Sequence, residues 1–367
     1  MARAVRVCEF ARDSAFRASG EDRLSMSDAR PLIVSIPEPR TLGLIFTPAD
    51  LAELRRKYRI VEAEGFGAAA AMEAHLPEAT YVLGQPPLPR ALLANARKLK
   101  AVFNVESNLL DNMDYDTCFA RGIHVLTTGK VFAQPVAEIG LGMALSLERG
   151  ICAADRAFRE GRELWGGDGN REARLMQGAE IGLIGCGDLG RALLKLLAGF
   201  RPRVRVYDPW LPPSKIAELD VEPAPLSEVL SQSDVIFVVA SVTAENGGFL
   251  GADAFASMRQ GASFILLSRA GVVDFGALTD AVRSGHIRAA SDVYPQEPLP
   301  LDHPVRSLEN FILSAHRAGA LDVAFKQMGR MVLEDMDLID RRLPPLACKR
   351  AERETVGRMR SRPVERN

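Results

Sequence analysis

The chain has 367 residues, of which 47% are hydrophobic and 25% are charged, and its net charge is −1. These values are typical of a globular protein of two domains, and they argue against a general nucleic-acid or membrane-surface binder. No apolar run approaches the ~18 residues that a membrane-spanning helix needs. Five cysteines and five histidines lack the spacing of metal ligands, so we expect no metal site, and the odd cysteine count favours a reducing cytoplasm.

The first residues of the chain are Arg-rich and lack the apolar stretch of a signal peptide. We predict that residues 1–28 form a disordered extension, or else that translation starts later, at Met26. An amphipathic targeting segment is the other interpretation, but Asp13, Glu21 and Asp22 speak against it.

Helical patterns and strand-like apolar runs alternate through residues 29–133, which predicts an α/β domain with a parallel sheet. We expect strands over 31–36, 41–46, 81–83, 101–105 and 123–127, and helices over 48–58, 89–98 and 114–121. From 135 to about 160 the pattern predicts one long helix, or two helices with a break near Gly150, at the passage to the next domain.

Residues 134–319 predict a doubly wound parallel sheet, because six apolar strands alternate there with helices. The strands are expected over 179–184, 204–208, 235–240, 263–267, 288–293 and 311–313, and the helices over 191–200, 225–232, 252–258 and 275–284. Residues 320–341 predict a further helix, and the segment 320–345 is expected to return to the first domain. The basic residues 346–367 predict a disordered tail, with a weak contact to nucleic acid or another anion as the alternative.

A glycine turn follows the first strand of this second domain. Gly185 permits a tight turn, Gly187 lets the backbone approach a pyrophosphate, and Gly190 lets the helix pack closely on the strand. The pyrophosphate is expected on the amides at the helix N-terminus. The carboxylate of Asp188 would repel a phosphate so close to it, and we expect this side chain to turn aside and cap the helix.

Asp208 ends the next strand, close to the ~20 residues beyond the turn at which an acid reads the ribose hydroxyls. Its charge would repel a 2′-phosphate, which favours NAD over NADP, although the nearby arginines Arg201, Arg203 and Arg205 could weaken that preference. A fold that uses the same turn for another ligand, such as S-adenosylmethionine, is the alternative.

Three further residues complete a set for moving a hydride and a proton. His316, Arg269 and Glu297 all follow the glycine turn. Histidine titrates near neutrality and can protonate a carbonyl oxygen, and the planar fork of arginine matches a carboxylate. Together they indicate the reduction of a 2-oxo acid or the oxidation of a 2-hydroxy acid.

The segments that hold these residues resemble the D-isomer-specific 2-hydroxyacid dehydrogenase family. The resemblance extends from about 178 to 319, with shorter matches upstream. The matching segments include Ile184-Gly-Cys-Gly-Asp-Leu-Gly, Val206-Tyr-Asp-Pro, Arg269-Ala-Gly-Val-Val-Asp, Ser291-Asp-Val-Tyr-Pro-Gln-Glu-Pro, His316-Arg-Ala-Gly and Asp111-Asn-Met-Asp.

The resemblance implies a fold and a dimer. It implies two Rossmann-like domains: an NAD-binding doubly wound sheet over 134–319, and a discontinuous flavodoxin-like substrate domain over 29–133 and 320–345. The long pattern from 135 to about 160 points, by the same resemblance, to a homodimer.

The resemblance also implies roles for single residues. His316 would be the general acid and base, Glu297 would bond its far ring nitrogen and fix its tautomer, and Arg269 would bind the substrate carboxylate. Asp292 would lie near the nicotinamide carboxamide. Cofactor contacts are expected from Gly185, Gly187, Asp188, Leu189, Gly190, Asp208, Ser241, Ser268 and Asp292.

One loop departs from the family. The family carries Gly-x-Gly just before Asp-Asn-x-Asp, whereas this chain has Glu106-Ser-Asn-Leu-Leu-Asp. Side chains narrow the conformations of such a loop, and Ser107 and Asn108 are expected to bind substrate in place of its amides. The departure leaves two alternatives open: an NAD-binding sensor or partner-binding module with little turnover, or an enzyme for a related anion such as formate or phosphite.

Overall fold

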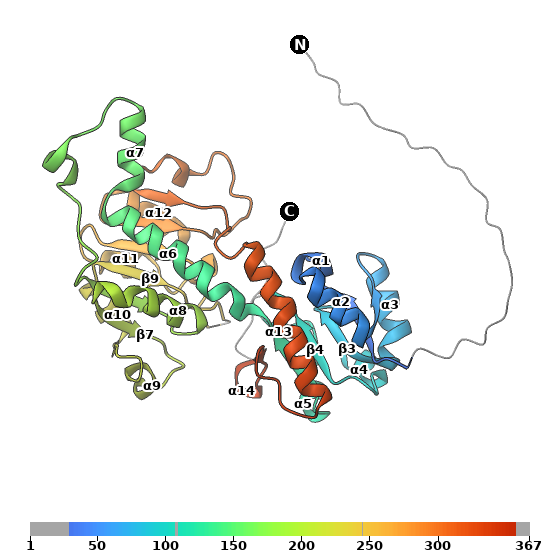
Figure 1. The fold of residues 1–367 in the computed structure, drawn as a ribbon. Coiled ribbons are helices and arrows are strands. Elements are labelled where there is room, and N and C mark those ends of the chain that lie inside the picture. Colours follow the sequence, from blue (N-terminus) through green and yellow to red (C-terminus); the bar gives the residue numbers. More distant parts are fainter. Residues whose placement is uncertain (1–28, 107–108, 244, 357–367) are drawn as a thin grey trace, which may run out of the picture.

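The computed structural model describes residues 29–106, 109–243 and 245–356, which form two α/β domains, each built on a parallel sheet (Figure 1). In the described part of the chain, no helix is long and apolar enough to cross a membrane. The predicted extension over 1–28 lies outside the described residues.

The first sheet has the strand order β13-β5-β4-β3-β1-β2, and β1 to β5 are all parallel. Its strands are β1 (Leu32–Ile36), β2 (Arg59–Glu62), β3 (Ala79–Gly84), β4 (Ala101–Asn104), β5 (His124–Thr127) and β13 (Lys349–Arg350). Its helices are α1 (Leu42–Ile45), α2 (Pro48–Lys57), α3 (Gly67–His75), α4 (Arg90–Asn95), α5 (Tyr115–Ala120), α13 (Asp322–Asp340) and α14 (Arg353–Val356).

The second sheet is parallel throughout and has the order β12-β11-β10-β9-β6-β7-β8. Its strands are β6 (Glu180–Ile184), β7 (Arg203–Tyr207), β8 (Glu222–Pro223), β9 (Val235–Val238), β10 (Ser263–Leu266), β11 (Arg288–Ser291) and β12 (Phe311–Leu313). Its helices are α6 (Ala133–Glu148), α7 (Ile151–Arg159), α8 (Asp188–Leu197), α9 (Pro213–Ala217), α10 (Leu226–Gln232), α11 (Ala252–Ala256) and α12 (Phe275–Arg283). A parallel sheet covered by helices on both faces needs apolar strands, and β9 and β10 are buried along their whole length.

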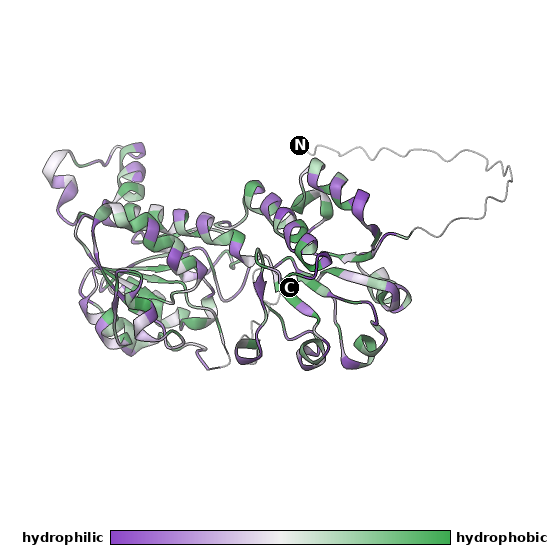
Figure 2. Cartoon of the chain, turned by 60° about the horizontal axis from the view of Figure 1, so that its bottom comes forward, coloured by the Kyte–Doolittle hydropathy of each residue, from purple (hydrophilic) through white to green (hydrophobic). Residues whose placement is uncertain are grey.

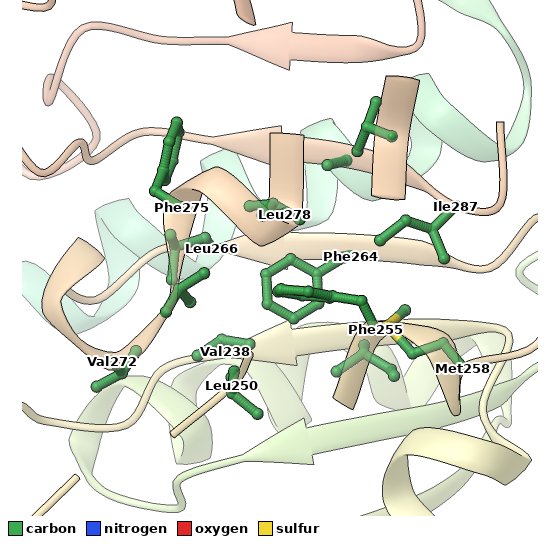
Figure 3. Close-up of a cluster of buried hydrophobic side chains, with 14 of the residues drawn as sticks. Val238, Leu250, Phe255, Met258, Phe264, Leu266, Val272, Phe275, Leu278 and Ile287 are labelled. Atoms are coloured by element: carbon green, nitrogen blue, oxygen red, sulfur yellow. The ribbon is translucent and has the colours of Figure 1, made fainter. Parts of the chain in front are cut away.

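Buried apolar side chains from the strands and helices form clusters in both domains. Much of the strand ribbon is accordingly coloured hydrophobic in Figure 2. In the second domain Phe255 of α11 meets Phe264 of β10 edge to face, with ring centroids 5.3 Å apart. Leu278 of α12 and Leu266 belong to the same cluster (Figure 3). Such packing fixes the strand ends from which the polar side chains of the site project.

The helix α13 joins the first domain although it follows the second in sequence. Its apolar residues Met328, Val332 and Met336 are buried in one cluster with Ile33 and Tyr81 of the first sheet. The polypeptide therefore passes twice between the domains, once before α6 and once before α13 (Figure 1).

Two expectations from the sequence are wrong. Residues 42–45 form the helix α1 and not a strand, because the Thr41 side chain accepts a hydrogen bond from the Leu44 N–H and caps the turn. Residues 346–356 are ordered: the buried Asp335 accepts hydrogen bonds from the N–H groups of residues 346–348, and β13 then pairs antiparallel with β5. The rest of the expected tail lies outside the described residues.

The helical pattern from 135 to about 160 forms two helices with a break near Gly150, which was one of the two predicted alternatives. α6 ends at Glu148, and Gly150 adopts φ +62° before α7 begins. Glycine adopts this left-handed conformation without the strain that a side chain would cause. The chain turns at Gly150, and α7 projects away from the sheet (Figure 1).

Candidate functional site

The glycine turn lies between β6 and α8 and has no room for side chains at two of its positions. Gly185 has φ +96°, and a Cβ there would come within 2.7 Å of the Ala240 backbone. A Cβ on Gly190 would come within 2.7 Å of the Gly185 carbonyl oxygen. At Gly187, by contrast, the space that a Cβ would enter holds no heavy atom within 4 Å. The turn is therefore tight on its protein side and open on the side where an anion would approach.

The helix α8 presents its N-terminus at this opening. Gly187 is the N-cap residue and makes no side-chain cap hydrogen bond, and Asp188 and Leu189 lie in the first turn. The expectation that the Asp188 side chain caps the helix is therefore wrong, because Asp188 is already inside the helix. Uncapped amides at the positive end of a helix dipole suit a pyrophosphate, so the turn fits a dinucleotide.

Asp208 follows β7 and faces the glycine turn. Its Oδ2 accepts a hydrogen bond from the Cys186 N–H at 2.8 Å, and its Oδ1 accepts one from the Trp210 N–H at 3.0 Å. Each carboxylate oxygen has two acceptor lone pairs, so both retain capacity for a ribose hydroxyl. The two backbone bonds fix the carboxylate beside the turn.

Two serines predicted to contact the cofactor differ in their surroundings. The Ser241 carbonyl accepts a hydrogen bond from the Asn246 side chain at 2.8 Å. The Ser268 hydroxyl is buried and has no hydrogen-bond partner among the described residues. A buried hydroxyl without a partner is costly, so Ser268 has a hydroxyl to offer to a bound molecule. The two contacts stay predictions.

His316 and Glu297 are in direct contact. The Nδ1 atom of His316 lies 2.6 Å from Oε2 of Glu297, and the Tyr294 N–H donates to Oε1 at 2.9 Å. The Glu297 side chain is 21% exposed and the His316 side chain is 41% exposed. The acid is thus held from both sides, while the outer part of the ring stays accessible.

The ionisation of Glu297 sets the histidine tautomer. Burial raises the pKa of this carboxyl, but the hydrogen bonds from His316 and the Tyr294 N–H, with the charges of His316 and Arg269, outweigh burial and lower the pKa below its usual value. An ionised carboxylate can only accept, so Nδ1 of His316 carries the hydrogen. The Nε2 atom is then the one that can exchange a proton with a substrate.

Asp292 holds the loop that carries His316. Its side chain is 1% exposed, and its two oxygens accept hydrogen bonds from the N–H groups of Arg317 and Ala318, each at 3.0 Å. Its carbonyl oxygen accepts the His316 N–H at 2.8 Å. His316 has φ +48°, a conformation that a non-glycine residue adopts only when its surroundings enforce it. The contact of Asp292 with a carboxamide stays a prediction.

Arg269 follows β10 and is a partly buried cation. Burial lowers the pKa of its guanidinium, and the charges of Glu106 and Glu297 act in the opposite direction. Glu297 belongs to the second domain and Glu106 follows β4 of the first domain. Charged side chains from the carboxyl edges of both sheets therefore act on Arg269.

The first domain contributes one residue that the sequence did not reveal. Arg40 follows β1 and forms an ion pair with Glu106, with Nη2 and Oε1 at 3.0 Å. No motif marks Arg40 as a site residue. The sequence feature that could have identified it is its position directly after the first strand. Ser107 and Asn108, predicted to bind substrate, lie outside the described residues.

Two other histidines have structural partners. Nδ1 of His286 lies 2.9 Å from the Gln260 side-chain oxygen, and Nδ1 of His303 accepts the Val305 N–H at 3.2 Å. In the described part of the chain no cluster of three His, Cys, Asp or Glu residues could hold a metal ion.

Comparison with known proteins identifies the second domain. Residues 141–318 match the family model described as D-isomer specific 2-hydroxyacid dehydrogenase, NAD binding domain. The cofactor of this domain is NAD.

Several relatives match over most of the chain. D-3-phosphoglycerate dehydrogenase of Mycobacterium leprae (strain TN) is 32% identical over 268 residues, which are 72% of this chain and 50% of that protein. Glyoxylate reductase of Korarchaeum cryptofilum (strain OPF8) is 32% identical over 240 residues, which are 64% of this chain and 72% of that protein. The chain thus spans about half the length of the phosphoglycerate dehydrogenases that it matches.

A solved structure is also similar. The crystal structure of a phosphoglycerate oxidoreductase from Rhizobium etli has 65% sequence identity and a TM-score of 0.82, and the match covers 89% of this chain and 100% of that chain.

Proposed function

The chain belongs to the D-isomer-specific 2-hydroxyacid dehydrogenase family, and from this membership we propose that it is an NAD-dependent oxidoreductase that interconverts a 2-hydroxy acid and a 2-oxo acid. One observation carries the proposal: His316, oriented by Glu297, and the partly buried Arg269 follow strands of the second sheet, whose carboxyl edge also carries the glycine turn. A proton donor and a carboxylate-binding cation are the two groups that this reaction requires from the protein.

In the proposed reaction, Arg269 binds the substrate carboxylate with two parallel hydrogen bonds. When bound, the nicotinamide of NADH supplies the hydride to the carbonyl carbon. His316 gives the proton on Nε2 to the carbonyl oxygen, and Glu297 holds the ring in place by accepting the hydrogen on Nδ1. The ring recovers its proton from water through its exposed side. In the oxidation direction His316 takes the proton from the hydroxyl group.

The proposal is tested by NADH oxidation with a panel of 2-oxo acids, namely glyoxylate, pyruvate, hydroxypyruvate and phenylpyruvate. We expect at least one of them to be reduced, and NADH to be used more efficiently than NADPH because the Asp208 carboxylate repels a 2′-phosphate. NADH binding without reduction of any acid would contradict the proposal and favour a binding module. A preference for NADPH would contradict the cofactor assignment alone.

We also propose a homodimer. The segment after α6 exposes a group of large apolar side chains, among them Trp165 at 75% and Phe158 at 62%, and their rings are in edge contact. The others are Ile151, Leu164 and Leu175. Such a group on a projecting arm is typical of a surface that a second copy covers. Light scattering tests this: the wild-type protein should have the mass of a dimer, and Trp165→Glu should shift it toward the monomer. A wild-type monomer would contradict the dimer.

The proposed compartment is the cytoplasm. Cys118, Cys152, Cys186 and Cys348 are free thiols. Free thiols are typical of a reducing compartment. Fractionation of cells, with an antibody to the protein, tests the location.

A further inference from the structure

Two charged side chains that the proposed reaction leaves unused lie at the carboxyl edge of the first sheet. Arg40 follows β1 and Glu106 follows β4, and these strands run in the same direction in one sheet. Their Nη2 and Oε1 atoms are 3.0 Å apart. Ligands of parallel α/β sheets bind outside the carboxyl ends of the strands, so the pair lies where a substrate is expected.

Arg40 is held rigidly. Its guanidinium lies 4.7 Å from the ring centroid of Phe325 and 5.5 Å from that of Phe132, and its Nε donates to the Val105 carbonyl at 2.9 Å. The side chain is 14% exposed. A cation fixed against two aromatic rings and partly removed from water holds its carboxylate partner in place, unlike a solvated surface pair.

Glu106 is fixed through its backbone and accessible at its side chain. Its N–H donates to the Asn104 side chain at 2.7 Å, and its carbonyl accepts the Thr127 hydroxyl at 2.7 Å. Its side chain is 25% exposed, more than that of Arg40. Because a carboxylate has about four acceptor positions, the contact with Arg40 leaves Glu106 able to accept further hydrogen bonds.

Glu106 and the proposed carboxylate-binding residue Arg269 follow the parallel strands β4 and β10, so each lies at the carboxyl edge of its sheet. In agreement with this placement, the charge of Glu106 acts on the Arg269 guanidinium. A substrate whose carboxylate is bound at Arg269 would therefore have its carbon chain near a second, negative acceptor. Such an acceptor favours a hydroxyl or amino group on that chain and disfavours another anion.

On the basis of the proposed function, we propose that Glu106 determines substrate specificity. Its carboxylate, held by Arg40, accepts a hydrogen bond from a donor group on carbon 3 of the 2-oxo acid, and it repels substrates with a second negative charge. Arg40 acts as a positioning residue. The substrate class is thus a 2-oxo acid with a hydroxyl or amino group next to the carbonyl carbon.

Three substrates with one carbon skeleton test this proposal. Pyruvate, hydroxypyruvate and phosphohydroxypyruvate carry a hydrogen, a hydroxyl and a phosphate on carbon 3. For the wild-type enzyme with NADH we expect kcat/KM to be highest for hydroxypyruvate. In Glu106→Gln the preference for hydroxypyruvate over pyruvate should fall about tenfold, because a hydrogen bond to a neutral amide is weaker than one to a carboxylate. The kcat/KM for phosphohydroxypyruvate should rise about tenfold, mainly through KM, when the negative charge is removed.

The matched control is Glu78→Gln, which removes an ion pair with Lys98 next to the N-terminal end of β3, at the opposite edge of the same sheet. It should leave both substrate ratios unchanged, and both variants should remain folded and keep the wild-type NADH affinity. The proposal is overturned if the wild-type enzyme uses phosphohydroxypyruvate at least as efficiently as hydroxypyruvate, or if Glu106→Gln leaves both ratios unchanged. Failure to reduce any 2-oxo acid would instead overturn the proposed function, and this inference with it.

Discussion

The side chains at the carboxyl edges of the two sheets are fixed in different ways. At the edge of the second sheet, His316 is fixed by Glu297 and Asp292, which all lie within one stretch of sequence. At the edge of the first sheet, Arg40 and Glu106 are fixed by contacts that join distant parts of the chain, since the ring of Phe325 covers Arg40. In this molecule the groups proposed for chemistry are positioned locally, and those proposed for specificity are positioned by tertiary structure.

This difference has a consequence for variation within the fold. A loop whose geometry depends on its own residues keeps its chemistry when the other domain changes. The pair Arg40 and Glu106, which is positioned by residues distant in sequence, can change its charge without disturbing that loop. His316 lies within residues 141–318, which match the family model, and Glu106 opens the loop that departs from the family's Gly-x-Gly.

The largest effect is expected from the second-sheet edge. Replacing His316 with Gln removes the proton donor but keeps a polar side chain, and kcat/KM should fall about 10²- to 10⁴-fold. The assay is NADH oxidation with the best 2-oxo acid, and His286→Gln, whose ring contacts Gln260, is the matched control. Retention of most of the activity by His316→Gln would exclude it as the donor.

The next largest effect on kinetics is expected from Arg269, the proposed carboxylate-binding residue. Arg269→Lys keeps the positive charge but loses the planar fork, so KM for the 2-oxo acid should rise about 10- to 100-fold with a smaller change in kcat. Steady-state kinetics at saturating NADH separates the two parameters. An unchanged KM would show that the substrate carboxylate is bound elsewhere.

A smaller effect is expected from the support of the His316 loop. In Asp292→Asn one side-chain oxygen replaces two, so one of the N–H groups of Arg317 and Ala318 loses its acceptor. The loop then relaxes from its strained conformation, and kcat should fall about tenfold while NADH affinity stays within a few-fold. A loss of NADH affinity with unchanged kcat would instead support the predicted contact of Asp292 with the cofactor.

The smallest effect is a change of stability with pH. The pKa of Glu297 is lower in the folded protein than its usual value of 4.5. Its ionised form therefore stabilises the fold above that value, and the contribution is lost as pH falls through the lower, folded-state pKa. The difference in unfolding free energy between wild type and Glu297→Gln should be constant near neutral pH and shrink in acid. Urea denaturation measures it, and a difference that grows in acid would contradict the direction of the shift.

The second domain could be predicted from sequence to a greater extent than the first. Its strands are continuous apolar runs, and the turn from Gly185 to Gly190 and the residues Arg269, Glu297 and His316 lie in recognisable segments. The helix at 42–45 was missed because the apolar run looks like a strand and only the Thr41 cap distinguishes it.

Long-range contacts could not be predicted. The order in residues 346–356 depends on Asp335, a buried carboxylate in the middle of α13 that no local pattern marks. Arg40 is likewise one arginine among many until the fold brings Glu106, Phe132 and Phe325 around it. In both cases the partners are far apart in sequence, so spacing carries no information about them.

Single-turnover kinetics tests most directly whether one edge performs chemistry and the other selects the substrate. Enzyme saturated with NADH is mixed with increasing hydroxypyruvate, and the limiting rate of NADH oxidation is separated from the apparent affinity for the acid. We predict that His316→Gln lowers the limiting rate about 10²-fold or more with little change in affinity, and that Glu106→Gln weakens affinity and leaves the limiting rate within a few-fold. A limiting rate that falls equally in both variants, or that is unchanged in His316→Gln, would contradict this division of labour.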